Sequence, residues 1–194
     1  MNSAFKTLIT AMHHCQACEN LLDHKPRPVF QISPKATILI AGQAPGQAVH
    51  KTGVPFDDPS GTRLRSWMGL SQEIFYDADK IAILPMGLCY PGKGRSGDLP
   101  PRQECAPLWR QRALDTMPNI QLTVLIGNYA LDWHLGDSKK SNLTKTVSAW
   151  QSYAPNIIPL PHPSPRNNIW LKKNPWFEAD ILPALKMRIK EILE

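Results

Sequence analysis

The sequence predicts a three-layer α/β/α fold with a four-stranded parallel central sheet, built as a single domain over residues 1–194. Two observations support this prediction. Short continuous apolar runs alternate with helix-forming segments, and such runs are typical of parallel strands that are buried on both faces. The length of 194 residues, with 42% hydrophobic and 20% charged side chains, suits one globular domain with a sizeable core.

The expected strands are residues 37–41 (TILIA), 81–84 (IAIL), 122–126 (LTVLI) and 157–160 (IIPL). Apolar periodicity predicts helices over residues 4–14, 102–117, 128–135, 142–153 and 174–194. A further helix, which carries Leu64, Trp67 and Met68, is expected to begin with Ser60 as its cap. Residues 43–61 and 90–101 are rich in glycine and proline and are expected to be loops.

The charge balance favours a polyanionic partner. Lysine and arginine exceed aspartate and glutamate to give a formal net charge of +6, which suits nucleic acid. No signal-peptide pattern precedes Cys15, and no apolar run is long enough for a transmembrane helix. We therefore expect a cytoplasmic protein, in a compartment where cysteines are metal ligands or free thiols rather than disulfides. A monomer is the default expectation for this fold.

The four cysteines form two spaced pairs. Cys15 and Cys18 make a C-x2-C turn, and Cys89 and Cys105 flank a loop rich in glycine and proline. Four thiolates brought together suit either zinc or a 4Fe–4S cluster, and unrelated buried or free thiols are the third interpretation. The neighbouring His13 and His14 leave a mixed histidine–cysteine site open as well.

Three candidate ligand-binding segments follow predicted strands. They are residues 42–46 (GQAPG), 85–89 (PMGLC) and 162–166 (HPSPR). Ligands of parallel α/β sheets bind at the carboxyl ends of the strands, where all three segments begin. Gly42 lets the backbone approach a planar group, Phe56 of the sequence TGVPF can stack on it, and His162 can donate a hydrogen bond.

These motifs resemble those of the uracil-DNA glycosylase superfamily. The cysteine spacing is similar to that of its iron–sulfur type (family 4), which ligates a 4Fe–4S cluster through C-x2-C and a distant cysteine pair. Residues 42–46 resemble the superfamily's G-x-x-P-G motif, and residues 162–167 (HPSPRN) resemble its H-P-S motif. HPSPRN and TGVPF are also similar to segments of single-strand-selective monofunctional uracil glycosylases.

The resemblance implies a role for each motif residue. A 4Fe–4S cluster would be held by Cys15, Cys18, Cys89 and Cys105, with zinc as the less favoured occupant. His162 would stabilise the departing base anion, and Gln43, with Asp58, would hold the attacking water. The base pocket would comprise Gly42, Ala44, Phe56, Ser164 and Asn128. DNA would be bound by Arg166, Asn167, Lys93 and Arg95.

Three positions depart from the family pattern. Superfamily members often carry Asp or Asn where this chain has Ala44, and the iron–sulfur type carries glutamate where this chain has Gln43. Glutamine orients a water but cannot act as a general base, so Asp57 and Asp58 are alternatives, although either could instead cap the helix that begins near Ser60. The family's base-reading asparagine is replaced by Pro85, which offers no side-chain donor or backbone N–H.

Other groups must therefore read the base edge. Asn128, Asn167 and the backbone near Met86 and Gly87 are the candidates. A subgroup that traps DNA covalently uses a histidine near the cluster, and no histidine lies between Cys89 and Cys105, which excludes that chemistry.

The leading hypothesis is a DNA base-excision glycosylase acting on a deaminated base, with uracil first and hypoxanthine or xanthine second. The alternative is a non-catalytic DNA-binding member that retains the cluster and the pocket, which the identities of Gln43, Ala44 and Pro85 favour. A zinc protein acting on free nucleosides or nucleotides is a third hypothesis.

Overall fold

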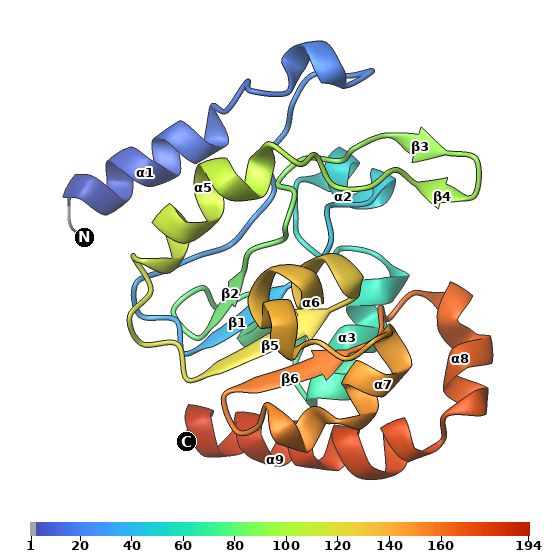
Figure 1. Cartoon of the computed structure of the whole chain (residues 1–194). Helices are drawn as coiled ribbons and strands as arrows, with labels where there is room; N and C mark the ends of the chain where they lie inside the picture. The colour runs from blue at the N-terminus through green and yellow to red at the C-terminus, as the bar shows by residue number, and fades with distance from the viewer. Residues whose placement is uncertain (1–2) are drawn as a thin grey trace.

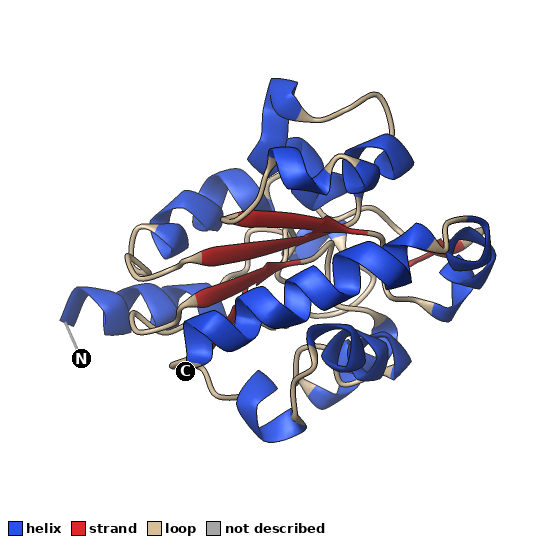
Figure 2. Ribbon diagram, turned by 90° about the horizontal axis from the view of Figure 1, so that it is seen from below, coloured by secondary structure: helices blue, strands red, loops and turns tan. Residues whose placement is uncertain are grey.

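The computed structural model describes residues 3–194 and shows three layers (Figure 1). Within these residues a parallel central sheet has the strand order β2–β1–β5–β6. Its strands are β1 (Ile38–Ala41), β2 (Ile81–Ile83), β5 (Leu122–Ile126) and β6 (Ile157–Leu160). Helices cover both faces of the sheet, as Figure 2 shows from a second direction. The predicted fold class and all four predicted strands are confirmed.

The helices of the described residues differ widely in length. They are α1 (Ser3–His13), α2 (Gln47–Thr52), α3 (Pro59–Met68), α4 (Gln72–Phe75), α5 (Cys105–Leu114), α6 (Asn128–Leu135), α7 (Leu143–Ser148), α8 (Asn168–Lys173) and α9 (Leu182–Leu193). None of them combines the length and the apolar character needed to cross a lipid bilayer.

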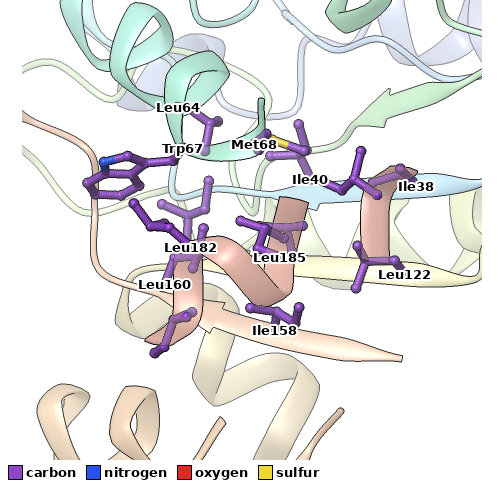
Figure 3. Close-up of a cluster of buried hydrophobic side chains, with 14 of the residues drawn as sticks. Ile38, Ile40, Leu64, Trp67, Met68, Leu122, Ile158, Leu160, Leu182 and Leu185 are labelled. Carbon is purple, nitrogen blue, oxygen red and sulfur yellow. The ribbon is translucent and has the colours of Figure 1, made fainter. Parts of the chain in front are cut away.

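Alternating side chains of each strand divide the core between the two faces of the sheet. Ile38 and Ile40 of β1 face α3 and α9, where they pack with Leu64 and Leu185 (Figure 3). Leu39, between them, faces the opposite layer and packs among α1 and α5. The carboxyl end of β5 is covered on that second face by α6. Both faces are thus buried, which explains the continuous apolar runs in the strands.

Strand β6 contains a proline, and its position in the sheet explains why this is tolerated. Pro159 lies opposite Leu125 of β5, and β6 pairs with β5 alone, at the edge of the sheet. A proline has no N–H to donate, so an edge strand can carry one without losing a ladder hydrogen bond.

Both segments predicted as loops contain regular structure. Residues 43–61 include α2, which ends at Gly53 in the left-handed region with a φ of 75°. The Arg27 side chain donates to the carbonyls of His50 and Lys51, each at 2.7 Å, and so caps this short helix. Residues 90–101 include an antiparallel hairpin of β3 (Lys93–Gly94) and β4 (Gly97–Asp98), which lies beside α2 (Figure 1).

The predicted cap of α3 was wrong by two residues. Asp58 is the N-cap, and its Oδ1 accepts a hydrogen bond from the N–H of Gly61 at 2.8 Å. Ser60 lies inside the first turn and is buried. Pro59 occupies the first helical position, where its fixed φ favours a helix and its missing N–H costs nothing, so the cap must precede it.

The helix predicted over residues 128–135 is confirmed as α6, and α1 is shifted by one residue from its predicted bounds, whereas three other predicted helices are shorter or divided. The segment 102–117 is helical only as α5, and 142–153 divides into α7 and a 3-10 turn over Trp150–Ser152. The C-terminal segment begins with a π-helical turn over Phe177–Ile181 that continues into α9. Helices α4 and α8 were not predicted, because single turns of four to six residues leave little periodicity to detect.

Candidate active site and cysteine cavity

A cleft of about 510 Å³ opens at the carboxyl ends of the strands. The segments that follow β1, β2 and β6 all contribute to its wall, together with α2 and the β3–β4 hairpin. The structure therefore brings the three strand-end segments into one site. The cleft-lining residues named from the sequence are Gly42, Gln43, Ala44, Phe56, Asp58, Pro85, His162, Ser164, Arg166 and Asn167.

The aromatic wall of the cleft depends on two glycines. A Cβ placed on Gly42 would lie 3.5 Å from the ring of Phe56, so the bare backbone of Gly42 lets that ring lie against the strand end. Phe56 itself has a φ of 56°, a conformation that costs a non-glycine residue roughly 1 kcal/mol or more. Its carbonyl oxygen packs against Gly61, where a Cβ would come within 1.7 Å. The surrounding backbone thus holds Phe56 in place.

His162 presents a defined hydrogen-bond donor to the cleft. Its Nδ1 accepts from the backbone N–H of Ser164 at 3.1 Å, so in the neutral ring the proton is on Nε2. Burial lowers the pKa of His162, and the carboxylates of Asp58 and Asp98 only partly oppose this effect. The imidazole is therefore neutral at neutral pH, with an Nε2–H available to donate.

The residues after His162 stabilise the loop that they form and connect it to the β3–β4 hairpin on the other side of the cleft. The Nδ2 of Asn167 donates to the carbonyl of His162 at 2.7 Å, which fixes the orientation of the amide. The Oγ of Ser164 accepts from the backbone N–H of Arg166 at 3.3 Å. The Arg166 guanidinium reaches across the cleft and donates to the carbonyl of Ser96 at 3.2 Å, in the β3–β4 hairpin. These contacts bind the two lips of the cleft together.

Two carboxylates line the cleft. Asp58 caps α3 through one of its oxygens. Asp98, at the end of β4, is the second, and the sequence patterns did not single it out. Its Oδ2 would lie 3.5 Å from a Cβ placed on Gly46, at the end of the glycine-rich turn. Asp98 belongs to the segment 90–101, which was predicted only as a loop rich in glycine and proline, so no role was assigned to its carboxylate.

Three candidates from the sequence lie away from the pocket wall. Asn128 is exposed at the start of α6 and does not line the cleft. Lys93 and Arg95 are exposed on the hairpin whose other residues form the lip. The backbone N–H groups of Met86 and Gly87 donate to Gly42 and Gln43, each at 2.9 Å. These two N–H groups hold the glycine-rich turn and are not free to read a ligand.

A buried arginine supports the floor of the cleft beside Pro85. Arg110 of α5 is 1% exposed and donates to the carbonyls of Leu84 and Pro85 at 2.9 and 3.3 Å. Its Nε also donates to Nε2 of His134 at 3.1 Å. Burial lowers the pKa of Arg110 to about 10, and the thiolate form of Cys105 opposes the shift. Its position in the apolar stripe of α5, one residue after Trp109, was the missed sequence signal.

The four cysteines line one small cavity on the other side of the β2 end. None is in a disulfide. The N–H of Leu88 donates to Sγ of Cys105 at 3.2 Å, and the indole N–H of Trp109 donates to Sγ of Cys15 at 3.1 Å. Burial raises the pKa of Cys89 to about 12 and that of Cys105 to about 11, and the neighbouring thiolates add to both shifts.

The four sulfurs can be compared with the donor sets of two kinds of metal centre. Across residues 3–194, no group of three or more His, Cys, Asp or Glu side chains is arranged to hold a metal ion. A structural zinc requires four donors that converge on one ion. A 4Fe–4S cluster binds each thiolate through a different iron, so its cysteines surround a volume instead. Four unpaired cysteines around one cavity, two of them accepting N–H hydrogen bonds, fit the cluster's donor set.

Together, the fold and the cleft define a parallel α/β protein with a strand-end pocket suited to a planar ring that hydrogen-bonds through its edge. The family model of the uracil DNA glycosylase superfamily matches residues 29–186. Because the match covers most of the chain, the protein belongs to this superfamily, as its motifs predicted. Membership implies DNA glycosylase activity in general, with DNA as the substrate. The matched region begins after Cys15 and Cys18.

Proposed function

We propose that this protein is a base-excision repair glycosylase that hydrolyses the N-glycosidic bond of a deaminated base in DNA, uracil first and hypoxanthine or xanthine second. The observation that carries the proposal is the cleft itself. The glycine-rich turn after β1 and the His162 loop after β6 line one pocket, with the Phe56 ring also in its wall. A glycosylase needs such a pocket because it takes the target base out of the helix before reacting.

The chemistry assigned to His162 follows from its protonation state. Cleavage of the glycosidic bond leaves negative charge on the base and positive charge on the sugar. A neutral imidazole whose Nε2–H donates to a base carbonyl oxygen stabilises the anion as it forms, and the Ser164 N–H keeps the ring in this tautomer. The flipped base stacks on Phe56, and the approach is close because Gly42 and Ala44 are small.

Asn167 is the side chain best placed to distinguish a deaminated base. It lines the cleft, and its Nδ2 already donates to the His162 carbonyl, which leaves Oδ1 as an acceptor. Uracil, hypoxanthine and xanthine carry a ring N–H beside a carbonyl, whereas cytosine and adenine present an unprotonated ring nitrogen there. An acceptor therefore favours the deaminated bases. Gln43 orients the attacking water, and Ser164 supports the same pocket wall.

The exposed basic residues serve DNA binding in this proposal. Lys93 and Arg95 stand on the hairpin beside the cleft, and Arg166 spans its two lips. Contacts from such side chains to phosphates hold the duplex without reading its sequence. They would position the strand that carries the flipped nucleotide.

We further propose that Cys15, Cys18, Cys89 and Cys105 hold a 4Fe–4S cluster. The cavity shared by the four cysteines and the two N–H donors to sulfur support a metal centre here. The resemblance of the cysteine spacing to that of the iron–sulfur type favours the cluster over zinc. When bound, the cluster supplies a covalent cross-link between the N-terminal segment, the β2 end and α5. The chain's own contribution is to bury the thiolates and to donate hydrogen bonds to them.

Protein purified without chelators is expected to be brown and to contain about four iron atoms per chain. The Cys105→Ser variant should lose the visible absorption and most of the iron, because one ligand of the cluster is missing. Metal analysis by mass spectrometry, with absorption spectroscopy, checks both results. The Thr116→Ser variant, beyond the end of α5, is the matched control and should keep the colour. Stoichiometric zinc without iron in the wild-type protein would contradict the proposal.

The test of the glycosylase uses oligonucleotides that carry uracil, hypoxanthine or xanthine. The wild-type protein is expected to leave abasic sites, detected by alkaline strand cleavage. Removing the Nε2–H donor in His162→Ala should slow the single-turnover rate by about 10²–10³-fold, as for the loss of one oxyanion donor. His162→Gln, which keeps an N–H donor, should retain more of the rate. Equal rates for His162→Ala and wild type would contradict the role of His162.

One observation favours the alternative of a DNA-binding protein without turnover. Pro85 replaces a base-reading side chain, and its carbonyl is directed to Arg110. If the wild-type protein leaves no abasic site in any of the three substrates but binds DNA with an affinity that falls steeply with salt, this alternative replaces the glycosylase.

A further inference from the structure

The mouth of the cleft contains a carboxylate that the superfamily motifs do not account for. Asp98 lies in β4 of the hairpin and is exposed, yet it lines the same cleft as His162 and Gln43. Its Oδ2 lies against the backbone of Gly46, where an added Cβ would be 3.5 Å away. The carboxylate therefore points toward the glycine-rich turn and not away from the molecule.

Two further interactions involve this carboxylate. The hydroxyl of Tyr90, a residue only 5% exposed, makes a side-chain hydrogen bond to Asp98. Asp58 first, and Asp98 after it, raise the pKa of His162 against the effect of burial. The hairpin carboxylate is thus within reach of the Tyr90 hydroxyl and lines the same cleft as His162.

The other carboxylate of the cleft is less available for chemistry. Asp58 accepts the Gly61 N–H at 2.8 Å as the cap of α3, so one of its oxygens is occupied by a structural role. Gln43 can orient a water but has no basic atom, and Ala44 has no polar side chain. Of the acidic groups lining the cleft, Asp98 is the one without a helix-capping duty.

Asp98 lies at the end of the glycine-rich turn where a general base would be needed. Residues 42–46 run from the strand end, where Phe56 lies against Gly42, to the cleft mouth, where Asp98 lies against Gly46. A base stacked on Phe56 places its sugar toward the mouth. The C1′ atom of that sugar, which the water must attack, would then lie on the Asp98 side of the pocket.

We propose that Asp98 is the general base of this site, a role that rests on the proposed glycosylase function. Asp98 and Gln43 hold one water. As the bond between C1′ and the base nitrogen breaks, its electron pair leaves with the base, whose carbonyl oxygen accepts the His162 hydrogen bond. The water oxygen bonds to C1′ and its proton passes to the Asp98 carboxylate. Asp98 then returns the proton to solvent, and the base anion takes one up on release.

The decisive variant is Asp98→Asn, because its Oδ1 can still accept from Tyr90 while the side chain can no longer take a proton. Its single-turnover excision rate is expected to fall by about 10²–10⁴-fold, the usual contribution of a general base. Its affinity for uracil-containing DNA should stay the same or rise, since a negative charge near phosphates is removed. Asp132→Asn, on the exposed side of α6, is the matched control and should excise at the wild-type rate.

Chemical rescue separates a catalytic role from a structural one. Added formate should restore part of the rate of Asp98→Ala, because a small carboxylate can occupy the vacated space, and Asp98→Glu should retain more activity than Asp98→Asn. If wild type excises uracil and Asp98→Asn does so equally fast, or if formate restores nothing, the inference fails and the glycosylase stands. If wild type excises no deaminated base, both fail.

Discussion

Replacing Gly61 with alanine is expected to lower the free energy of unfolding by roughly 4 kcal/mol, near the upper end of single-substitution effects. An added Cβ would lie 1.7 Å from the carbonyl oxygen of Phe56 and 2.6 Å from its carbonyl carbon. Both neighbours are backbone atoms, so no side-chain rotation relieves the overlap. The α3 start and the Phe56 turn would have to separate, and the Asp58 cap would be disturbed with them.

The expected destabilisation is opposite to the effect that helix propensity predicts for glycine-to-alanine replacement. Alanine at an unconstrained helical position is about 1 kcal/mol more favourable than glycine, so propensity alone predicts stabilisation. Urea unfolding followed by circular dichroism measures the difference. Thr62→Ala, at the next and exposed position of α3, is the control and should change stability by less than about 1 kcal/mol. A Gly61→Ala protein as stable as wild type would show that the Phe56 turn relaxes freely.

The elements of the central sheet were predictable because burial on both faces gives each strand a continuous apolar run. The short elements were not. Helix α2 is held by the Arg27 side chain from a distant part of the sequence, and the β3–β4 hairpin has only two residues in each strand. In both cases the stabilising contacts come from tertiary structure, which local patterns do not contain.

The candidate site divides in the same way. His162 and Gly42 were predictable because each belongs to a local motif at a strand end, and Phe56 because it belongs to the TGVPF motif. Asp98 and Arg110 were not, because their significance depends on what folds against them. Asp98 became a candidate only when the hairpin was seen to line the cleft. Asn128 directly follows the strand and the Gly127 cap, yet its side chain is exposed at the start of α6 and outside the cleft.

Arg110 lies between the cleft and the cysteine cavity and interacts with residues of both. It supports the carbonyls of Leu84 and Pro85 at the cleft floor, and the group that electrostatically favours its charge is Cys105. A buried cation is costly unless an anion offsets it. Four thiolates with a 4Fe–4S cluster carry net negative charge, so the proposed cluster would stabilise this arginine and, through it, the β2 end.

His134, the hydrogen-bond partner of Arg110, makes the stability of the folded protein depend on pH. Burial and the Arg110 guanidinium lower the pKa of His134 to about 3, from an ordinary value of 6.5. The unfolded chain therefore takes up a proton on His134 below pH 6.5, and the folded chain does not. Between pH 6.5 and about 3 the unfolded state binds more protons than the folded state. The contribution of His134 to the free energy of unfolding is therefore complete above pH 6.5 and is lost as the pH falls towards about 3.

We expect His134 to remove on the order of 3 kcal/mol of folding free energy between neutral pH and about pH 4. His134→Gln should abolish this part of the loss, since the Gln Oε1 can accept from Arg110 without titrating. Urea unfolding of both proteins at about pH 8 and pH 4 measures it, with similar stabilities expected at the higher pH. If the variant loses as much stability on acidification as wild type, His134 is protonated in the folded protein. It would then not be the neutral acceptor of the Arg110 hydrogen bond.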